Sequence, residues 1–212
     1  MRAKKVAVIA SAPSPRREAA SRRLIEATLD CIATLGLRET TVPDIAARAG
    51  MAVGSISQYF AGKEALYTAA LDAMAREFAE RVADRVAAAG PSPARRLCAY
   101  VDAYFDVRTG QRRKVAVWFA FWAEVQAQPQ YQAVCAGHDR AHDALVESLV
   151  SDLVGPAHSA AQARLLTSCC YGLWLELLTA HPRPSREALH ALAYQQLAAL
   201  FPAHAGEFAQ TE

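Results

Sequence analysis

Aromatic side chains in the second half of the chain have the types and spacing of a site for a positively charged ligand. Trp118 and Trp122 are four residues apart, so a helix would place both on one face. Tyr171 and Trp174 would share a face of another helix in the same way. Aromatic rings attract quaternary ammonium groups by about 0.5 to 2 kcal/mol through cation–π interactions. These four residues therefore predict a pocket for a cationic or amine ligand.

Two more side chains are candidates for the same pocket. Glu176 lies in an apolar stretch and would balance a cation, although it is about 200° around the helix from Trp174. Tyr104, on the helix expected after Pro93, is a candidate for the pocket wall. The alternative is that these aromatic residues only fill the core, which is the usual role of such stripes.

Two histidines have the spacing of zinc ligands. His138 and His142, in the sequence His-Asp-Arg-Ala-His, are four residues apart, as on the helix of a zinc hydrolase. Asp139 stands where such helices have a longer Glu base, and no third ligand is evident. A solvated helix face is the alternative, and we therefore expect no metal, no catalytic residue and no enzyme.

The cysteines allow a second alternative, a thiol redox sensor. There are five, an odd number without CxxC spacing, so neither a disulfide framework nor a zinc cage is indicated. Cys169 and Cys170 are adjacent, but they lie in the most apolar stretch, whereas reactive thiols need exposure and a positive neighbourhood. We expect buried cysteines and a reducing, cytoplasmic location.

Apolar residues recur at helical spacing along almost the whole chain after residue 15. No segment alternates with period two, and no GxGxxG or Walker pattern occurs, so we expect an all-α fold without a nucleotide or other cofactor. The expected helical segments are 18–35, 41–50, 53–59, 63–86, 94–107, 114–126, 130–153, 159–178 and 185–200.

Two of these segments have the spacing of a helix-turn-helix. Thr41 and Asp44 form an approximate capping box, with Pro43 in the first turn. This helix ends at Gly50, and the short helix 53–59 follows after a turn. In a helix-turn-helix the second helix lies in the major groove and the first braces it. Many all-α proteins contain two short helices, so this spacing alone leaves other roles open.

The residue string of this region closely resembles the DNA-binding segment of TetR-type transcriptional regulators. The matching residues are Thr40-Thr41-Val42, Asp44-Ile45-Ala46, Ala49-Gly50, Gly54, Ile56, Tyr59-Phe60, Lys63 and Leu66. The resemblance implies a homodimer whose N-terminal three-helix domain, 16–78, binds double-stranded operator DNA. The helical remainder, 79–212, would bind a small-molecule effector and dimerise, and residues 1–15 would form a flexible basic arm. A repressor released by its effector is implied, with activation left open.

The resemblance also implies roles for single residues. Val53, Ser55, Ser57 and Gln58 would face base edges, and Gln58 is the most informative because Gln can form two hydrogen bonds with adenine. The phosphate-contact candidates are Thr41, Gly54, Tyr59 and Lys63, with capping, packing or solvation as the alternative. The basic cluster Arg16, Arg17, Arg22 and Arg23 would add phosphate contacts. Ala52 stands where family members commonly have Ser or Thr, which removes a helix cap.

A narrower resemblance concerns the betaine-operon, BetI-type repressors that respond to choline. Trp118-Phe119-Ala120-Phe121-Trp122-Ala123, Gly172-Leu173-Trp174-Leu175 and Gly54-Ser55-Ile56-Ser57-Gln58-Tyr59-Phe60 resemble the matching stretches of that group. Glu176 stands where we would expect a basic residue in that group, so the resemblance implies a cationic ligand without specifying choline.

Composition and charge agree with a globular DNA-binding regulator. The 212 residues are 53% apolar and 21% charged, with a net charge of +2. Through Leu66 there are ten basic and six acidic residues, which favours a polyanion partner at the front of the chain. Nonspecific DNA packaging would need a far more basic chain.

The end of the chain has the pattern expected of a dimer interface. Residues 165–180 are too short and too interrupted to span a membrane and predict a deeply buried helix. The leucines that would pack in a bundle with a second copy are Leu165, Leu166, Leu173, Leu177, Leu189, Leu192, Leu197 and Leu200.

Overall fold

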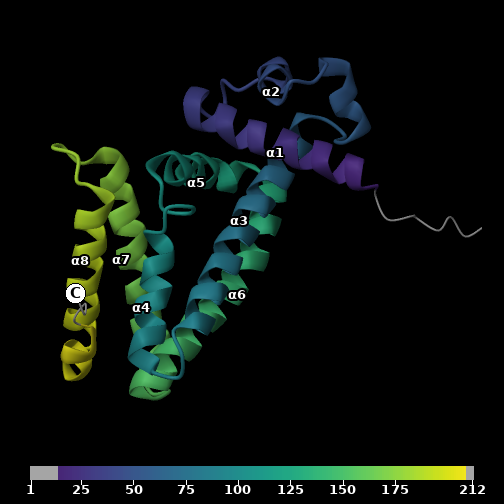
Figure 1. Cartoon of the computed structure of the whole chain (residues 1–212). Helices are drawn as coiled ribbons and strands as arrows, with labels where there is room; N and C mark the ends of the chain where they lie inside the picture. Colours follow the sequence, from purple (N-terminus) through teal and green to yellow (C-terminus); the bar gives the residue numbers. More distant parts are fainter. Residues whose placement is uncertain (1–13, 209–212) are drawn as a thin grey trace, which may run out of the picture.

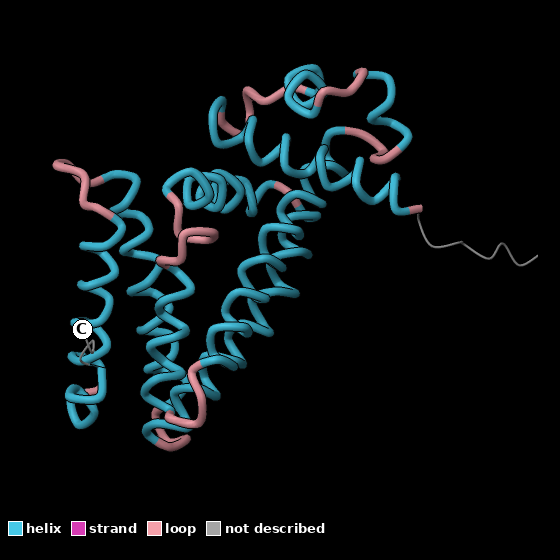
Figure 2. Tube along the Cα trace, viewed as in Figure 1, coloured by secondary structure: helices cyan, strands magenta, loops and turns pink. Residues whose placement is uncertain are grey.

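The computed structural model describes residues 14–208, which form helices joined by short turns and contain no strand (Figure 2). This confirms the predicted all-α class. The elements are α1 (Pro15–Leu35), α2 (Val42–Ala49), the 3-10 helix η1 (Val53–Gln58), α3 (Lys63–Ala88), α4 (Pro93–Tyr104), α5 (Arg112–Glu124), the 3-10 turn η2 (Val125–Ala127), α6 (Pro129–Val154), α7 (Ser159–Thr179), α8 (Arg186–Leu200) and the 3-10 helix η3 (Pro202–Phe208).

The first helix begins within the predicted arm. The Ser14 hydroxyl accepts a hydrogen bond from the Arg17 N–H at 3.4 Å and caps α1, so the helix begins at Pro15. The rest of the predicted arm, residues 1–13, lies outside the described residues. Within residues 14–208, no helix combines the length and hydropathy that a membrane span needs.

The helices α1 and α2, with η1, form a unit on the first turns of α3 (Figure 1). Leu24, Ile45, Ile56 and Leu66 are buried in its core. The Tyr67 hydroxyl of α3 donates toward the carbonyls of Leu37 and Thr40, at 3.2 and 3.0 Å. These bonds tie the segment between α1 and α2 directly to α3.

The remaining helices pack beneath this unit. Figure 1 shows α3 running down beside α6, with α4, α7 and α8 in the adjoining layer. In agreement, α3 contacts α4 and α6, and α7 contacts α6 and α8. The short helix α5 lies under α1 and contacts both α1 and α7. Because α3 is continuous from residue 63 to 88, the predicted boundary at residue 78 falls inside one helix that belongs to both parts.

The helix expected over 94–107 ends early, at Tyr104. The chain turns back there because the Thr109 hydroxyl donates to the Ala103 carbonyl. Gly110 then packs against the backbone of Tyr104, where a Cβ atom would lie 2.1 Å from the Tyr104 carbonyl oxygen. Only glycine can make this close approach.

The prediction of a deeply buried helix over residues 165–180 is wrong for the single chain. Leu165 is 52% exposed and Leu175 45% exposed. The predicted interface leucines also divide: Leu166, Leu173, Leu177, Leu189 and Leu197 are buried in the chain's own core, and Leu192 and Leu200 are half-buried. The helix is amphipathic, and Leu165, Gly172 and Leu175 belong to its open face.

Candidate DNA-binding surface and ligand cavity

The predicted capping box at the start of α2 is present. The Thr41 N–H donates to Oδ2 of Asp44 at 2.9 Å, and the Thr41 hydroxyl accepts from the Asp44 N–H at 3.4 Å. Gly50 then takes the left-handed conformation, φ 63° and ψ 41°, and turns the chain toward η1. Both features follow from the residue types, because a capping box needs a hydroxyl and an acid three residues apart and this backbone region favours glycine.

The second helix of the pair is a single 3-10 segment with one buried residue. Ile56 is 3% exposed and fixes which side of η1 faces the core. Val53, Gly54, Ser57 and Gln58 are exposed on the other sides, and Ser55 is half-buried. The candidate base-reading side chains therefore include two that are exposed, the amide of Gln58 and the isopropyl group of Val53.

Hydroxyl groups inside η1 have partners in the chain itself. Ser55 Oγ donates to the Ala52 carbonyl at 2.7 Å and Ser57 Oγ to the Gly54 carbonyl at 3.0 Å. Ala52 occupies the N-cap without a side-chain hydrogen bond, as its residue type requires. Either serine must turn its hydroxyl away from this carbonyl to donate to DNA, whereas the exposed amide of Gln58 has no such bond within the described residues.

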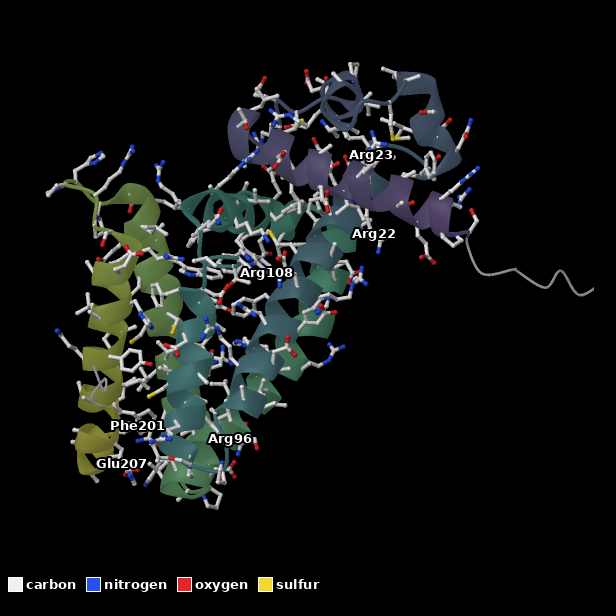
Figure 3. The ribbon with its side chains drawn as sticks, in the orientation of Figure 1. Arg22, Arg23, Arg96, Arg108, Phe201 and Glu207 are labelled. Carbon is white, nitrogen blue, oxygen red and sulfur yellow. The ribbon has the colours of Figure 1, made fainter. Side chains whose placement is uncertain are left out.

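Several candidate phosphate contacts also have internal partners. The Arg17 guanidinium lies 5.6 Å from the centre of the Tyr59 ring, and the Lys63 ammonium 5.1 Å from that of Tyr67. Figure 3 labels Arg22 and Arg23 on α1; Arg23 donates to the carbonyl of Ala49 at the end of α2. This hydrogen bond makes Arg23 a brace between α1 and α2, and its contact with phosphate stays a prediction.

The structure brings four predicted ligand-site residues together around one cavity. Trp118 and Trp122 of α5 meet Tyr171 and Trp174 of α7 at its wall, and the cavity volume is about 160 Å³. The ring centres of Trp118 and Trp122 are 5.5 Å apart, and those of Trp122 and Tyr171 are 5.0 Å apart. The rest of the lining comes from Ala75, Phe78, Ala79 and Val82 of α3 and from His138, Asp139, Ala141, His142 and Leu145 of α6.

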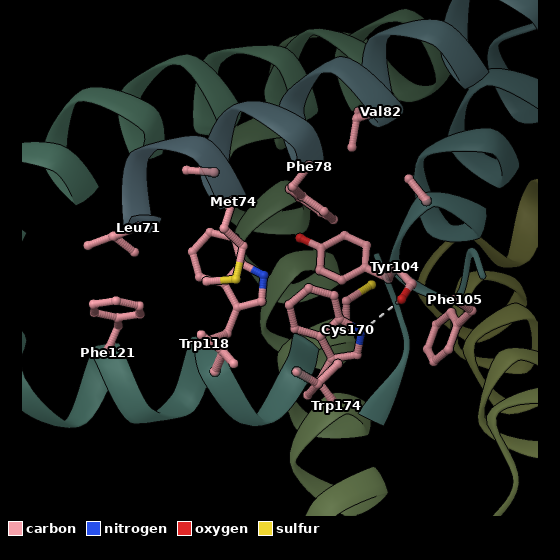
Figure 4. Packing of buried hydrophobic residues seen from close by; sticks show 14 of the residues in the cluster. Leu71, Met74, Phe78, Val82, Tyr104, Phe105, Trp118, Phe121, Cys170 and Trp174 are labelled. Carbon is pink, nitrogen blue, oxygen red and sulfur yellow. Dashed lines mark hydrogen bonds between the residues drawn. The ribbon is translucent and has the colours of Figure 1, made fainter. Parts of the chain in front are cut away.

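The same aromatic rings form part of the core and part of the cavity wall. Trp174 is 1% exposed, and its Nε1 donates to the Tyr104 carbonyl at 2.8 Å, the dashed line of Figure 4. Phe78 packs against Trp174 with ring centres 5.7 Å apart. Tyr104 is fully buried behind this wall and does not line the cavity. The predicted wall residue is therefore a support for Trp174.

A buried hydrogen-bond relay stands behind the cavity. His142 Nε2 lies 3.1 Å from the hydroxyls of both Tyr100 and Tyr104, which are 3.0 Å from each other. Thr167 Oγ1 is 3.1 Å from the Tyr100 hydroxyl. Burial lowers the pKa of His142, so its imidazole is neutral at pH 7 and can accept a hydrogen bond from a tyrosine hydroxyl.

The acidic residue of the cavity is Asp139 and not Glu176. Glu176 is exposed and does not line the cavity, because its position on α7 turns away from Trp174. Asp139 lines the cavity yet remains exposed, so it lies where the cavity meets solvent. Burial and the neighbouring Asp143 carboxylate raise the pKa of Asp139. The sequence signal was the period of α6, which places Asp139 beside His138 and His142.

The two histidines of the zinc alternative have separate partners. His138 Nε2 is 2.9 Å from Oδ1 of Asp72, while His142 faces the tyrosines. No group of three or more potential ligands occurs within residues 14–208. The expected solvated face is present only in part: Asp139, Arg140 and Asp143 are exposed, whereas His138 and His142 are half-buried and line the cavity.

The thiols do not form a redox centre with an activated cysteine. Cys170 is 1% exposed, and burial raises its pKa far above the ordinary thiol value. Burial also raises the pKa of Cys98 to about 11 and that of Cys135 above the ordinary value. A thiol that is protonated at neutral pH is a poor nucleophile.

Family models match both parts of the chain. A model of bacterial regulatory proteins of the tetR family matches residues 24–70, and one of the C-terminal part of BetI-type transcriptional repressors matches residues 93–202. The transcriptional regulator BetI 1 of Chromohalobacter salexigens is 33% identical over 73% of this chain and 76% of its own length. BetI of Serratia proteamaculans is 31% identical over 84% of this chain and 86% of its own length.

Solved structures share the fold. A transcriptional regulator from Rhodococcus sp. Rha1 has a TM-score of 0.77 at 22% identity, covering 86% of this chain and 96% of its own. A regulator from Saccharomonospora viridis, solved in complex with choline, has a TM-score of 0.75 at 19% identity, with 86% and 96% covered. Together with the matches along the sequence, the helix-turn-helix and the aromatic cavity, these findings show that the chain is a transcriptional regulator, not an enzyme, and belongs to the BetI-type repressors of the TetR family.

Proposed function

We propose that this regulator binds operator DNA as a homodimer in the cytoplasm and releases it when a small cationic ligand enters the aromatic cavity. The observation that carries the proposal is the cavity wall of Trp118, Trp122, Tyr171 and Trp174, joined by the carboxylate of Asp139. Aromatic faces and a carboxylate are the groups that recognise a quaternary ammonium ion. The choline bound by the Saccharomonospora viridis regulator supports the same ligand class.

The size of the cavity favours a compact ligand. Its volume of about 160 Å³ is below the roughly 300 to 1,000 Å³ of pockets for drug-sized molecules. Aliphatic side chains of α3 and α6 complete the wall, and the phenyl ring of Phe78 faces Trp118 and Trp174. A trimethylammonium group with a short tail has the shape and charge that this lining fits.

DNA contact is assigned to the exposed side of α2 and η1. Gln58 would read a base in the major groove, with Val53, Ser55 and Ser57 around it. Thr41, Gly54, Tyr59 and Lys63 would position the helix on the phosphates. Two copies related by a two-fold axis would then require a roughly palindromic operator.

Two elements connect the cavity with this surface. α5 supplies Trp118 and Trp122 to the cavity and is ion-paired with α1 through Arg113 and Asp30 at 2.8 Å. α3 lines the cavity through Phe78 and holds the DNA-binding unit through Tyr67. A ligand that fits better when α3 and α5 shift would favour a form with wrongly spaced recognition helices, by as much as its affinities for the two forms differ.

Thermal melting with candidate ligands tests the ligand class. Choline or tetramethylammonium at 100 times its Kd should stabilise the protein by about 2.7 kcal/mol, a rise of several degrees in Tm. Trp122→Ala should lose this rise, whereas Phe119→Leu, on the same helix but outside the cavity lining, should keep it. A rise with fatty acids or uncharged aromatic compounds, and none with either ammonium ion, would contradict the proposed ligand class.

A further inference from the structure

The cavity has an acidic residue in its lining. Asp139 lines it, and Asp143 follows one turn later on the same helix. In the part of the chain that the structure describes, no lysine or arginine lines the cavity, and none forms an ion pair with Asp139. The imidazole of His142 is kept neutral by burial. A bound ligand therefore meets the Asp139 carboxylate and aromatic faces but no lysine or arginine, and Nε2 of His138 already lies 2.9 Å from Asp72.

The other charged groups near the cavity have partners of their own. Asp72 of α3 lies 2.9 Å from His138, and Lys114 of α5 lies 2.5 Å from Glu77. Behind the cavity wall, α4 contributes the uncharged hydroxyls of Tyr100 and Tyr104, and α7 contributes that of Thr167. Asp139 is thus the carboxylate that faces the cavity without a basic partner among the described residues.

We propose that Asp139 selects the ligand by its net charge, so that the cavity accepts a quaternary ammonium cation and rejects a zwitterion of the same size. This inference rests on the proposed cationic ligand. A carboxylate on the ligand would lose water without finding a donor of opposite charge, and it would lie near Asp139. Specificity of this kind comes from the repulsion built against the wrong ligand as much as from attraction to the right one.

The test compares three probes of similar shape by the fluorescence of the cavity tryptophans. Choline is a cation, glycine betaine is a zwitterion, and 3,3-dimethyl-1-butanol is an uncharged copy of choline. The variants are Asp139→Asn and, as a matched control, Glu176→Gln, which removes an exposed acid outside the cavity. Asp139→Glu keeps the charge, and a melting curve of each variant without ligand checks that it is folded.

The wild-type protein should bind choline at least about 30-fold more tightly than glycine betaine, a difference of about 2 kcal/mol. Asp139→Asn should weaken choline binding about tenfold, equal to about 1.4 kcal/mol, and narrow the gap to glycine betaine. It should leave the affinity for 3,3-dimethyl-1-butanol unchanged. Glu176→Gln should behave as the wild type, and Asp139→Glu should retain most of the preference for choline.

Three results would overturn the inference, and they do so in two different ways. Equal binding of choline and glycine betaine by the wild type, or equal choline binding by Asp139→Asn and Glu176→Gln, would contradict charge selection while leaving the cationic ligand intact. Binding of 3,3-dimethyl-1-butanol with no binding of choline would contradict the proposed ligand class, and charge selection with it.

Discussion

At the scale of single residues, Gln58 and Lys63 separate base reading from phosphate contact. Gln58→Ala should weaken binding to the operator by about 1 to 3 kcal/mol. On an operator in which the base pair read by Gln58 has been changed, the same substitution should have little further effect. Lys63→Ala should weaken binding to all sequences alike and lower the salt slope by about one. Binding titrations over single-base operator variants at several salt concentrations measure both. Equal losses on every sequence for Gln58→Ala would contradict its assigned role.

Asp106 should make the free energy of unfolding depend on pH in the acid range. Its burial opposes ionisation, but hydrogen bonds from Arg81, Arg85 and the Arg108 N–H outweigh this effect and lower its pKa from 3.8 to about 2. An acid whose pKa is lowered by folding stabilises the protein above its unfolded pKa, and this contribution is lost as the pH falls toward the folded pKa. Asp106 should therefore contribute about 2 kcal/mol at pH 7, lost between about pH 4 and pH 2.

Chemical denaturation of Asp106→Asn across this pH range measures the contribution. The variant should lose at least about 2 kcal/mol at pH 7, because the arginines lose their anion, and its stability should change less between pH 4 and pH 2. Asp84→Asn, an exposed acid on α3, is the control and should keep the wild-type pH dependence. If Asp106→Asn kept the pH dependence of the wild type, the loss of stability between pH 4 and pH 2 would come from other groups.

At the scale of elements, α5 is the candidate link between ligand and DNA. Arg113 and Asp30 are 47% and 41% exposed, so their ion pair adds little stability. Its expected effect is on coupling: Arg113→Ala should leave ligand affinity unchanged but reduce the ligand's effect on DNA binding by about two- to fivefold, or 0.4 to 1 kcal/mol. DNA titrations with and without saturating choline measure this. The same reduction in Arg96→Ala, whose ion pair with Asp152 lies outside the cavity lining, would assign the effect to surface charge in general.

The helices were predictable because each has a local signal, such as the Thr41 cap or the Gly50 turn, and an apolar face with period 3.6. The early end of α4 was not, because it depends on Gly110 meeting the backbone of Tyr104. The cavity aromatics Trp118 and Trp174 were foreseen from their types and spacing. The place of Asp139 in the cavity lining was missed because the sequence does not show which side of α6 faces α3 and α7.

At the scale of the whole molecule, the open faces of α7 and α8 are the expected dimer interface. Leu165 and Leu175 are exposed in the single chain, and so are the small residues Gly172 of α7 and Ala191 of α8. Leu165→Asp with Leu175→Asp should give a folded monomer in analytical ultracentrifugation and lose palindromic operator binding. Val107→Asp, which changes a residue 57% exposed outside these helices, should remain dimeric. A doubly substituted protein that stays dimeric would place the interface elsewhere.

The most direct test of the account is the affinity for a DNA operator, selected from random sequences, with and without choline. Fluorescence anisotropy should show that saturating choline weakens operator binding by the wild type at least about tenfold, or 1.4 kcal/mol of coupling. Trp122→Ala should bind the operator equally well and fail to respond. An operator affinity that saturating choline leaves unchanged, in a protein whose melting shows that choline is bound, would contradict release of DNA by a ligand in this cavity.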